Sequence, residues 1–396
     1  MTPQAPQALD AGSRPGRSEA ELRDRQLRGE LQVRTAAEYR QLVQQAGLAE
    51  AFASTDVVVA AEALFTDQAS LQLSLGPADP PIRLRALQLA NVRGLAGCGP
   101  GEVLLPIGGG LTDGGRRGGA HVLAALLAGE PVPLAASGEA TLQHPRRELH
   151  GDLSLGQIGG GRLLLHRAIQ ENGIVAVSSA EGLCHTPHGA LLGPLVNALY
   201  TCPGAGSIGL TMPGLSLLGP GSPVLVAGGI GWVLGSGSGH QPQPRRQSGG
   251  QALSPGASAA VAVDLHALDP RWIRACFFEG HGSALLVAIA APVPLLDPDG
   301  ARQAAAGPAE LQAPVLDLAI PRRVKPALGS ISYAELESGR FQLNGASLRC
   351  APAHSPRLAA SLAADLAERL RSGQFPLRLP ALPLTARPAL RPLDLG

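Results

Sequence analysis

Glycine and proline interrupt this chain so often that it is predicted to fold into many short elements. Its 396 residues include 51 glycines and 35 prolines, and both residues favour turns over the interiors of helices and strands. Hydrophobic residues make up 45%, whereas charged residues make up 16%, against a usual share of about 25%. This composition argues against a solvated tail or a coiled coil. The prediction is a compact α/β domain with a mixed sheet of short strands, Gly/Pro-rich turns and a C-terminal helix.

Short apolar runs bounded by turn residues predict the strands of this sheet. They lie at 56–60, 173–179, 223–227, 259–263 and 284–290. Helical spacing extends over 18–48, with Gly47 as a stop, and a shorter helix is predicted over 121–128, ended by Gly129. Two stretches are predicted to be surface loops, 241–258 and 297–312.

The clearest helical pattern lies near the C-terminus, over 355–372. Ser355 is a suitable N-cap, Pro356 suits the first helical position, and Gly373 ends the pattern. A helix over this range presents one leucine stripe, which is expected to pack on the main body: Leu358, Leu362, Leu366 and Leu370. The chain as a whole is divided into a disordered leader (1–17), a main domain (18–385) and a tail (386–396).

Several classes of partner are not expected. The formal net charge is +1 and aromatic residues make up 3%, too few for a surface on which nucleic-acid bases stack. The polar N-terminus lacks the apolar core of a signal peptide, and the longest apolar run, 284–296, contains two prolines, so no membrane segment is predicted. The five cysteines form no CxxC pair, as expected of reduced thiols in a cytoplasmic protein. Neither a cofactor nor a metal site is predicted, and the oligomeric state is left open.

A glycine-rich run at 228–239 precedes His240. Its backbone N–H groups can bind a phosphate or a carboxylate, although tight β-turns explain the glycines almost equally well. The run lacks the acidic residue of a dinucleotide-binding fingerprint and the lysine of a P-loop. His240 is the best acid/base candidate, with a solvated loop histidine as the alternative.

Four other positions have both a functional and a structural interpretation. Asp67 serves as a general base if it is buried, and otherwise caps a turn. Asp79, which precedes two prolines, either contacts a ligand or forms a rigid turn. His121 stands where a helix begins and either binds an anion or packs. Cys98 is either a nucleophile or a small buried thiol.

Five stretches, in the same order and at similar spacing, resemble the homocysteine biosynthesis family, the L-aspartate semialdehyde sulfurtransferases. The resemblance covers about 35–385 and is carried by 55–84 (TDVVVAAEALFTDQASLQLSLGPADPPIRL), 118–129 (GGAHVLAALLAG), 138–147 (GEATLQHPRR), 228–242 (GGIGWVLGSGSGHQP) and 278–296 (FEGHGSALLVAIAAPVPLL). The family's two characteristic cysteines fall at Asp67 and Gln143 in this sequence.

The resemblance implies sulfur transfer to L-aspartate semialdehyde, which forms homocysteine. It also implies a small-molecule substrate and a separate sulfur- or electron-donating protein as partner. Transferred position by position, it predicts one cleft with four catalytic side chains: Asp67, His121, Gln143 and His240. The substrate-binding positions that it predicts are Asp79, Arg146, Gly228, Gly229, Gly231 and Gly237.

The loss of both cysteines leaves two functional hypotheses. A thiolate attacks carbonyl carbons and carries sulfur, whereas a carboxylate or an amide does neither well at neutral pH. The chain is therefore either a sulfurtransferase of this type or a non-catalytic or repurposed paralogue. Such a paralogue binds a small anionic metabolite or a partner protein through the glycine scaffold. Homocysteine formation from added sulfide distinguishes the two.

Overall fold

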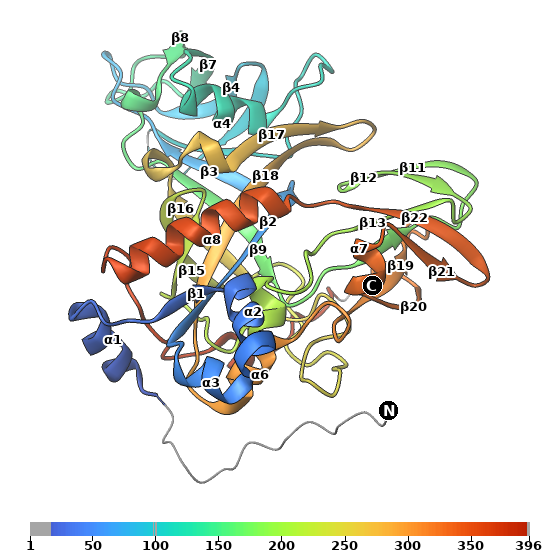
Figure 1. Ribbon diagram of the computed structural model, residues 1–396. Coiled ribbons are helices and arrows are strands. Elements are labelled where there is room, and N and C mark those ends of the chain that lie inside the picture. Colours follow the sequence, from blue (N-terminus) through green and yellow to red (C-terminus); the bar gives the residue numbers. More distant parts are fainter. Residues whose placement is uncertain (1–16, 98, 100, 394–396) are drawn as a thin grey trace, which may run out of the picture.

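The computed structural model describes residues 17–97, 99 and 101–393 (Figure 1). The predicted leader thus lies outside the described residues except for Arg17, and so does Cys98. Arg17 is held in place, because its Nε lies 3.2 Å from Oδ1 of Asp56 and its backbone N–H donates to the carbonyl of Leu296. Arg25 adds a second ion pair to Asp56, whose side chain is 1% exposed. The start of the described chain is therefore tied to a buried carboxylate.

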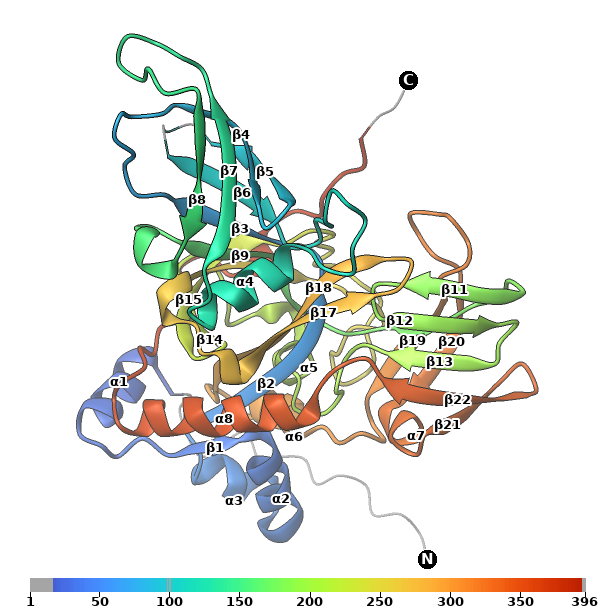
Figure 2. The same ribbon diagram turned by 90° about the horizontal axis from the view of Figure 1, so that it is seen from above.

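A mixed sheet of 14 strands forms the centre of the described structure (Figure 2). Its order is β1-β2-β18-β14-β15-β16-β9-β3-β6-β5-β4-β7-β8, and β17 pairs with β18. The strands are β1 (Val33–Thr35), β2 (Val57–Thr66), β3 (Ala69–Ser74), β4 (Leu84–Leu89), β5 (Val92–Ala96), β6 (Glu102–Pro106), β7 (Val132–Gly138), β8 (Glu148–Leu153), β9 (Arg162–Gln170), β14 (Pro223–Val226), β15 (Gly229–Ser236), β16 (Ser258–Asp264), β17 (Ile273–Phe278) and β18 (Gly282–Pro294).

A smaller sheet of six strands has its own hydrophobic core around Tyr333, Phe341 and Leu348. Its order is β20-β19-β10-β13-β22-β21. The strands are β10 (Val175–Val177), β13 (Asn197–Tyr200), β19 (Gln312–Asp317), β20 (Ala327–Ser332), β21 (Arg340–Leu343) and β22 (Ala346–Pro352). A separate hairpin consists of β11 (Gly182–Thr186) and β12 (Gly189–Gly193). Figure 2 shows this sheet and the hairpin at one end of the molecule and strands β4 to β8 at the other.

Several helices lie near β1 and β2 of the large sheet (Figure 1), and others pack on β17 and β18 or on the small sheet. The helices are α1 (Glu19–Leu27), α2 (Ala36–Ala46), α3 (Leu48–Ala53), α4 (Gly119–Leu127), α5 (Ile208–Thr211), α6 (Pro298–Ala305), α7 (Tyr333–Glu337) and α8 (Pro356–Arg371). The described residues contain no helix with both the length and the apolar character needed to cross a membrane.

The strand that leads to Asp67 is β2, and it is buried along most of its length. Its sequence VVVAAEALFT is almost free of polar side chains, and its first seven residues are buried. It pairs in parallel with β1 and in antiparallel fashion with β18, from Val57 opposite Pro294 to Thr66 opposite Leu285. Pairing on both edges and burial on both faces fix the position at which the strand ends. The end of the strand therefore determines the position of Asp67, the next residue.

The predicted C-terminal helix is confirmed as α8, which packs on β2 and β18. The Ser355 side chain accepts a hydrogen bond from the Leu358 N–H, and Gly373 follows with φ of 72°. The inner members of the leucine stripe, Leu362, Leu366 and Leu370, are 0% exposed, and Leu358 is half-buried. The amphipathic pattern was sufficient here because caps and stripe lie within one local segment.

Truncation of this stripe is expected to destabilise the fold. We expect Leu366→Ala to lower the free energy of unfolding by about 2–5 kcal/mol, because it removes buried methyl groups and leaves a cavity above β2. Leu358→Ala, at the half-buried end of the same stripe, is the matched control with an expected loss of about 1 kcal/mol. Urea unfolding followed by circular dichroism measures both. Equal losses at the two positions would contradict the packing described here.

Two predictions about secondary structure are wrong in part. The helical pattern over 18–48 is split into α1 and α2, because Gly29 adopts a φ of 70° after α1 and β1 then pairs with β2; α3 begins at the last residue of the predicted range. Gly47 does end α2, as predicted. The predicted loop at 297–312 contains α6, since Asp297 caps its N-terminus and Ala301 and Ala304 are buried.

The predicted strands are confirmed. Two of them are shorter than predicted (β10 and β14), and three are longer (β2, β16 and β18). They correspond to β2, β10, β14, β16 and β18. The short helix predicted over 121–128 is α4, which begins two residues earlier and is followed by Gly129 with φ of 74°.

Candidate functional site

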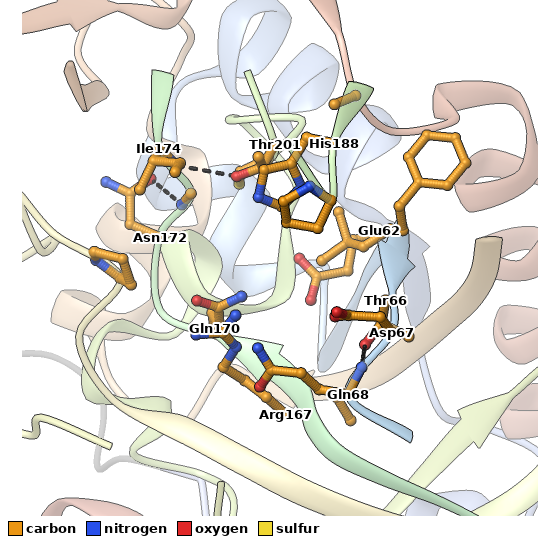
Figure 3. Close-up of a pocket in the computed structure, with 18 of the residues that line it drawn as sticks. Glu62, Thr66, Asp67, Gln68, Arg167, Gln170, Asn172, Ile174, His188 and Thr201 are labelled. Carbon is orange, nitrogen blue, oxygen red and sulfur yellow. Dashed lines mark hydrogen bonds between the residues drawn. The ribbon is translucent and has the colours of Figure 1, made fainter. Parts of the chain in front are cut away.

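A cavity of about 170 Å³ lies beside the end of β2. Segments that are far apart in the sequence meet here, among them β2, β9 and the turn between β11 and β12 (Figure 3). Strand β18 and the loop before β20 also line the cavity. The polar side chains that line it include Glu62, Thr66, Asp67, Gln68, Arg167, Gln170, Asn172, His188, Thr201 and Lys325. Both acidic and basic groups are therefore available to a small ligand.

Asp67 is joined to a histidine that comes from another part of the sheet. His281 lies in the turn between β17 and β18, and its Nε2 is 3.0 Å from Oδ2 of Asp67. The side chains of His281 and Asp67 are 27% and 30% exposed, and Asp67 is the member of the pair that lines the cavity. The pairing of β18 with β2 explains the contact, because it brings Leu285 opposite Thr66 and the preceding turn next to Asp67. A carboxylate that orients an imidazole is a common arrangement for proton transfer.

Two cations line the same cavity. Burial lowers the pKa of Arg167, and the nearby Asp67 carboxylate opposes this change. In the part of the chain that the structure describes, no carboxylate lies within ion-pair distance of the Arg167 guanidinium. Lys325, the sole lysine of the sequence, donates to the backbone carbonyl of Ile320 at 2.5 Å. Arg167 is therefore the cation best placed to bind a ligand carboxylate, since a guanidinium stays charged when it is partly buried.

His188 is a neutral partner in this cavity. It occupies the turn between β11 and β12, which is fixed by the Thr186 hydroxyl donating to the Gly189 carbonyl at 2.7 Å. Burial, together with the charge of Arg167, lowers the pKa of His188 to about 4. Its imidazole is therefore uncharged at neutral pH and can both donate and accept a hydrogen bond.

Glu62 projects from the middle of β2 into the cavity (Figure 3). The residue is 1% exposed, and its Oε1 has no hydrogen-bond partner among the described residues. Burial raises the pKa of Glu62 to about 8, and the hydrogen bond from the Ile208 backbone opposes the rise. The carboxyl group is thus protonated at neutral pH and can act as a proton donor.

Cys202 is the one cysteine among the described residues that line this cavity. Burial raises the pKa of Cys202 to about 11, and the neighbouring Glu62 adds to the rise. At neutral pH the thiol is protonated and is a poor nucleophile. The cavity can bind an anion and transfer protons, but its described thiol is not activated.

A sequence profile described as "Homocysteine biosynthesis enzyme, sulfur-incorporation" matches residues 31–377. The chain belongs to this family. Among curated proteins, L-aspartate semialdehyde sulfurtransferases from Methanosarcina acetivorans and Methanocaldococcus jannaschii are each 28% identical to it. The first alignment covers 89% of this chain and 69% of the relative, and the second covers 82% and 63%. No solved structure matches the chain.

Of the four catalytic positions predicted from the homocysteine biosynthesis family, Asp67 alone lines this cavity. His121 lines a separate cavity next to α4, where its Nδ1 accepts from the Gly118 N–H at 3.2 Å. Burial lowers the pKa of His121, and Arg117 adds to this effect. Gln143 is exposed in the loop between β7 and β8.

His240 is 0% exposed and is not among the residues that line the cavity around Asp67. Its Nδ1 accepts a hydrogen bond from the Ser258 N–H at 3.0 Å, and its Nε2 has no partner among the described residues. The neighbouring Gly239 does approach Arg167, so the loop that contains His240 borders the site.

The predicted substrate-binding residues support turns. Arg146 donates to the backbone carbonyls of Asp79 and Pro80, across the cis peptide bond that joins these two residues. In the β14–β15 hairpin, Gly228 has φ of 87° and faces the Trp272 ring. Both the backbone conformation and the ring therefore exclude a side chain at this position. Gly229, Gly231 and Gly237 likewise lie against neighbouring atoms, where an added Cβ meets another residue at 2.9 Å.

Sequence reasoning missed His281, Arg167 and Glu62. His281 lies inside the quoted run FEGHG, but nothing local connects it to Asp67. Glu62 did have a local signal, because it is the one carboxylate in the apolar strand VVVAAEALFT. A buried strand rarely carries an unpaired acidic residue without a reason.

Proposed function

We propose that this member of the homocysteine biosynthesis family binds L-aspartate semialdehyde, or a small aldehyde of the same charge, in the cavity beside Asp67. Arg167 binds the substrate carboxylate, and the Asp67–His281 pair transfers protons at the aldehyde oxygen. The sulfur comes from outside the chain, as sulfide or from a separate sulfur-donating protein. The observation that carries this proposal is the 3.0 Å contact between Asp67 and His281 at a cavity with an unpaired arginine in the described residues.

The reaction from aldehyde to thiol defines what the cavity must supply. Sulfide forms a carbon–sulfur bond at the aldehyde carbon, and the carbonyl oxygen takes up protons and leaves as water. Two electrons and two protons then reduce the carbon–sulfur double bond to the thiol. The Asp67–His281 pair is positioned to deliver a proton to the oxygen, because Asp67 lines the cavity and His281 contacts its carboxylate. The two-electron reductant comes from a separate electron-donating protein.

Two of the described thiols, one in the cavity and one on β17, favour an external sulfur source. Cys202 has a raised pKa because it is buried, and Cys276, on β17, also has a pKa raised by burial. A thiol that stays protonated attacks sulfur donors slowly. A small sulfide ion or a donor protein supplies the nucleophile without requiring a thiolate from the described residues.

Removal of the cavity arginine is expected to weaken substrate binding. We expect Arg167→Met to raise the dissociation constant for L-aspartate semialdehyde roughly 10- to 100-fold, the value of one charge-assisted hydrogen bond. Arg162→Met, at an exposed position of the same strand, is the matched control with no expected change. Isothermal titration calorimetry measures both. Equal affinities for the two variants would show that Arg167 does not bind the substrate.

Product analysis tests the proposed reaction. Purified protein is supplied with L-aspartate semialdehyde, sulfide and a two-electron reductant, and homocysteine is quantified by mass spectrometry. We expect product above the protein-free rate, and a loss of that excess in His281→Gln. Binding without any product would instead favour the alternative function, a non-catalytic or repurposed paralogue that holds a small anionic metabolite or a partner protein.

A further inference from the structure

A second cavity, of about 420 Å³, lies on the other side of the wall that bounds the first. Strand β2 contributes to both, with Ala61 facing the second cavity and Glu62 the first. In two other segments of the wall, adjacent residues also line opposite cavities. Thr201 lines the first cavity and Tyr200 the second, and Ala353 lines the first and His354 the second. The two spaces are therefore separate but share one layer of backbone.

The second cavity contains polar groups that have no partner in the described structure. His354 is 9% exposed, and neither ring nitrogen makes a hydrogen bond with the described residues. Nη1 of Arg40, on α2, is buried and also lacks a partner there. Each such group costs about 1–3 kcal/mol when it is left unsatisfied, and native proteins contain few of them. Their presence around one cavity points to a ligand.

Opposite charges face this cavity without touching. Glu337 lies at the end of α7 on the exposed rim, and its carboxylate and the Arg40 guanidinium influence each other electrostatically. No ion pair within 4.0 Å joins them in the described structure. Burial lowers the pKa of His354 to about 4, so its ring is uncharged at neutral pH. The cavity thus offers a cation, an anion and a neutral donor or acceptor.

The remaining wall is apolar and made of small side chains. Alanines from α2 and α8 form one part of it: Ala36, Ala37, Ala359, Ala360 and Ala363. Small side chains leave room for a short apolar group, but they offer no polar contact to it. A ligand that satisfies every part of this cavity carries a carboxylate, an ammonium group and a short apolar side chain.

We propose that the second cavity is a binding site for a small zwitterionic α-amino acid. The carboxylate accepts hydrogen bonds from Arg40 and His354, the ammonium group faces Glu337, and the side chain lies against the alanines of α8. This site is distinct from the substrate cavity around Asp67, and it does not depend on the reaction proposed there. Its occupant contacts β2, the strand that carries Glu62 and leads to Asp67.

Calorimetric titration with L-2-aminobutyrate tests this proposal on the full chain. We expect it to bind at least about tenfold more tightly than butyrate or propylamine, which each lack one of its two charges. Arg40→Met and Glu337→Gln are each expected to weaken this binding about tenfold or more. Arg167→Met, in the first cavity, is the matched control and leaves it unchanged. Glu337 is an exposed rim residue, so its variant keeps the test valid if Arg40→Met fails to fold.

Three results would overturn the proposal. Equal binding of butyrate and L-2-aminobutyrate would make the cavity a simple anion site. Binding that is lost in Arg167→Met but retained in Arg40→Met would assign the amino acid to the first cavity. Absence of any binding by a folded protein would mean that water alone satisfies Arg40 and His354.

Discussion

A cysteine introduced at position 67 is expected to carry a persulfide that the unmodified chain lacks at this site. The Asp67→Cys thiol would lie beside His281, whose Nε2 is 3.0 Å from the present carboxylate, and on the cavity that Arg167 lines. Neighbouring imidazole and guanidinium groups favour a thiolate, which is the form that attacks a sulfur donor. After incubation with polysulfide, peptide mapping by mass spectrometry should place one additional sulfur atom on residue 67, removable by a reductant.

Gln143→Cys is the matched control for this experiment. Gln143 is exposed in the loop between β7 and β8 and does not line the cavity. Its cysteine variant should take up much less sulfur than the variant at position 67. Similar labelling of both cysteines would show that the surroundings of Asp67 do not activate a thiol.

Growth of a homocysteine-requiring host extends the same test to function. The unmodified chain is expected to support growth only when sulfide is supplied, whereas the double variant Asp67→Cys, Gln143→Cys should need less sulfide. Growth with the unmodified chain and no added sulfide would point to another sulfur carrier or to Cys98. Failure of all variants would favour the repurposed paralogue.

Replacement of Glu62 by glutamine is expected to stabilise the protein at alkaline pH. Burial raises the pKa of Glu62 from 4.5 to about 8. Between these values the folded state keeps a proton that the unfolded state has released, so the free energy of unfolding falls as pH rises from 4.5 to 8. Glu62→Gln removes this dependence. Above pH 8 we expect the variant to be more stable by about 3–5 kcal/mol, with little difference below pH 4.5.

The measurement is urea unfolding of both proteins across pH 5 to 9. His188 and His354 have pKa values lowered to about 4 by burial, so their contribution is lost as pH falls from 6.5 to 4. This loss of stability at acidic pH is the same in both proteins, so it cancels when their free energies of unfolding are subtracted. Glu130→Gln, at an exposed position, controls for the change in charge. A constant difference across the whole range would show that Glu62 is already ionised in the folded protein.

Predictions from sequence succeeded for this fold where the signal was local. The helix α8 has its cap, its leucine stripe and its terminal glycine within one short segment, and β2 is an uninterrupted apolar run. The strand β1 was missed because Val33 is extended only through its pairing with Val57 of β2. Helix α6 was missed although Asp297 and Pro298 mark its start, because the pattern is short.

The same distinction applies to the site. Asp67 could be singled out because it stands in a quoted stretch of the family, and the structure places it at a cavity. Its neighbours His281, Arg167 and His188 come from three other segments, and only long-range strand pairing and the packing of the separate β11–β12 hairpin bring them together. Gln143 and His121 share a family resemblance with Asp67 but line no common cavity with it.

The position of β2 in the sheet also has a consequence for biosynthesis. Its neighbour β18 and its covering helix α8 follow it by roughly 230 to 300 residues. At about 5–20 residues per second, roughly 10–60 s pass between the synthesis of β2 and that of these partners. During this interval the apolar strand VVVAAEALFT has neither its antiparallel partner nor its cover. The ribosome-bound chain therefore exposes an aggregation-prone segment until β18 and α8 have been synthesised.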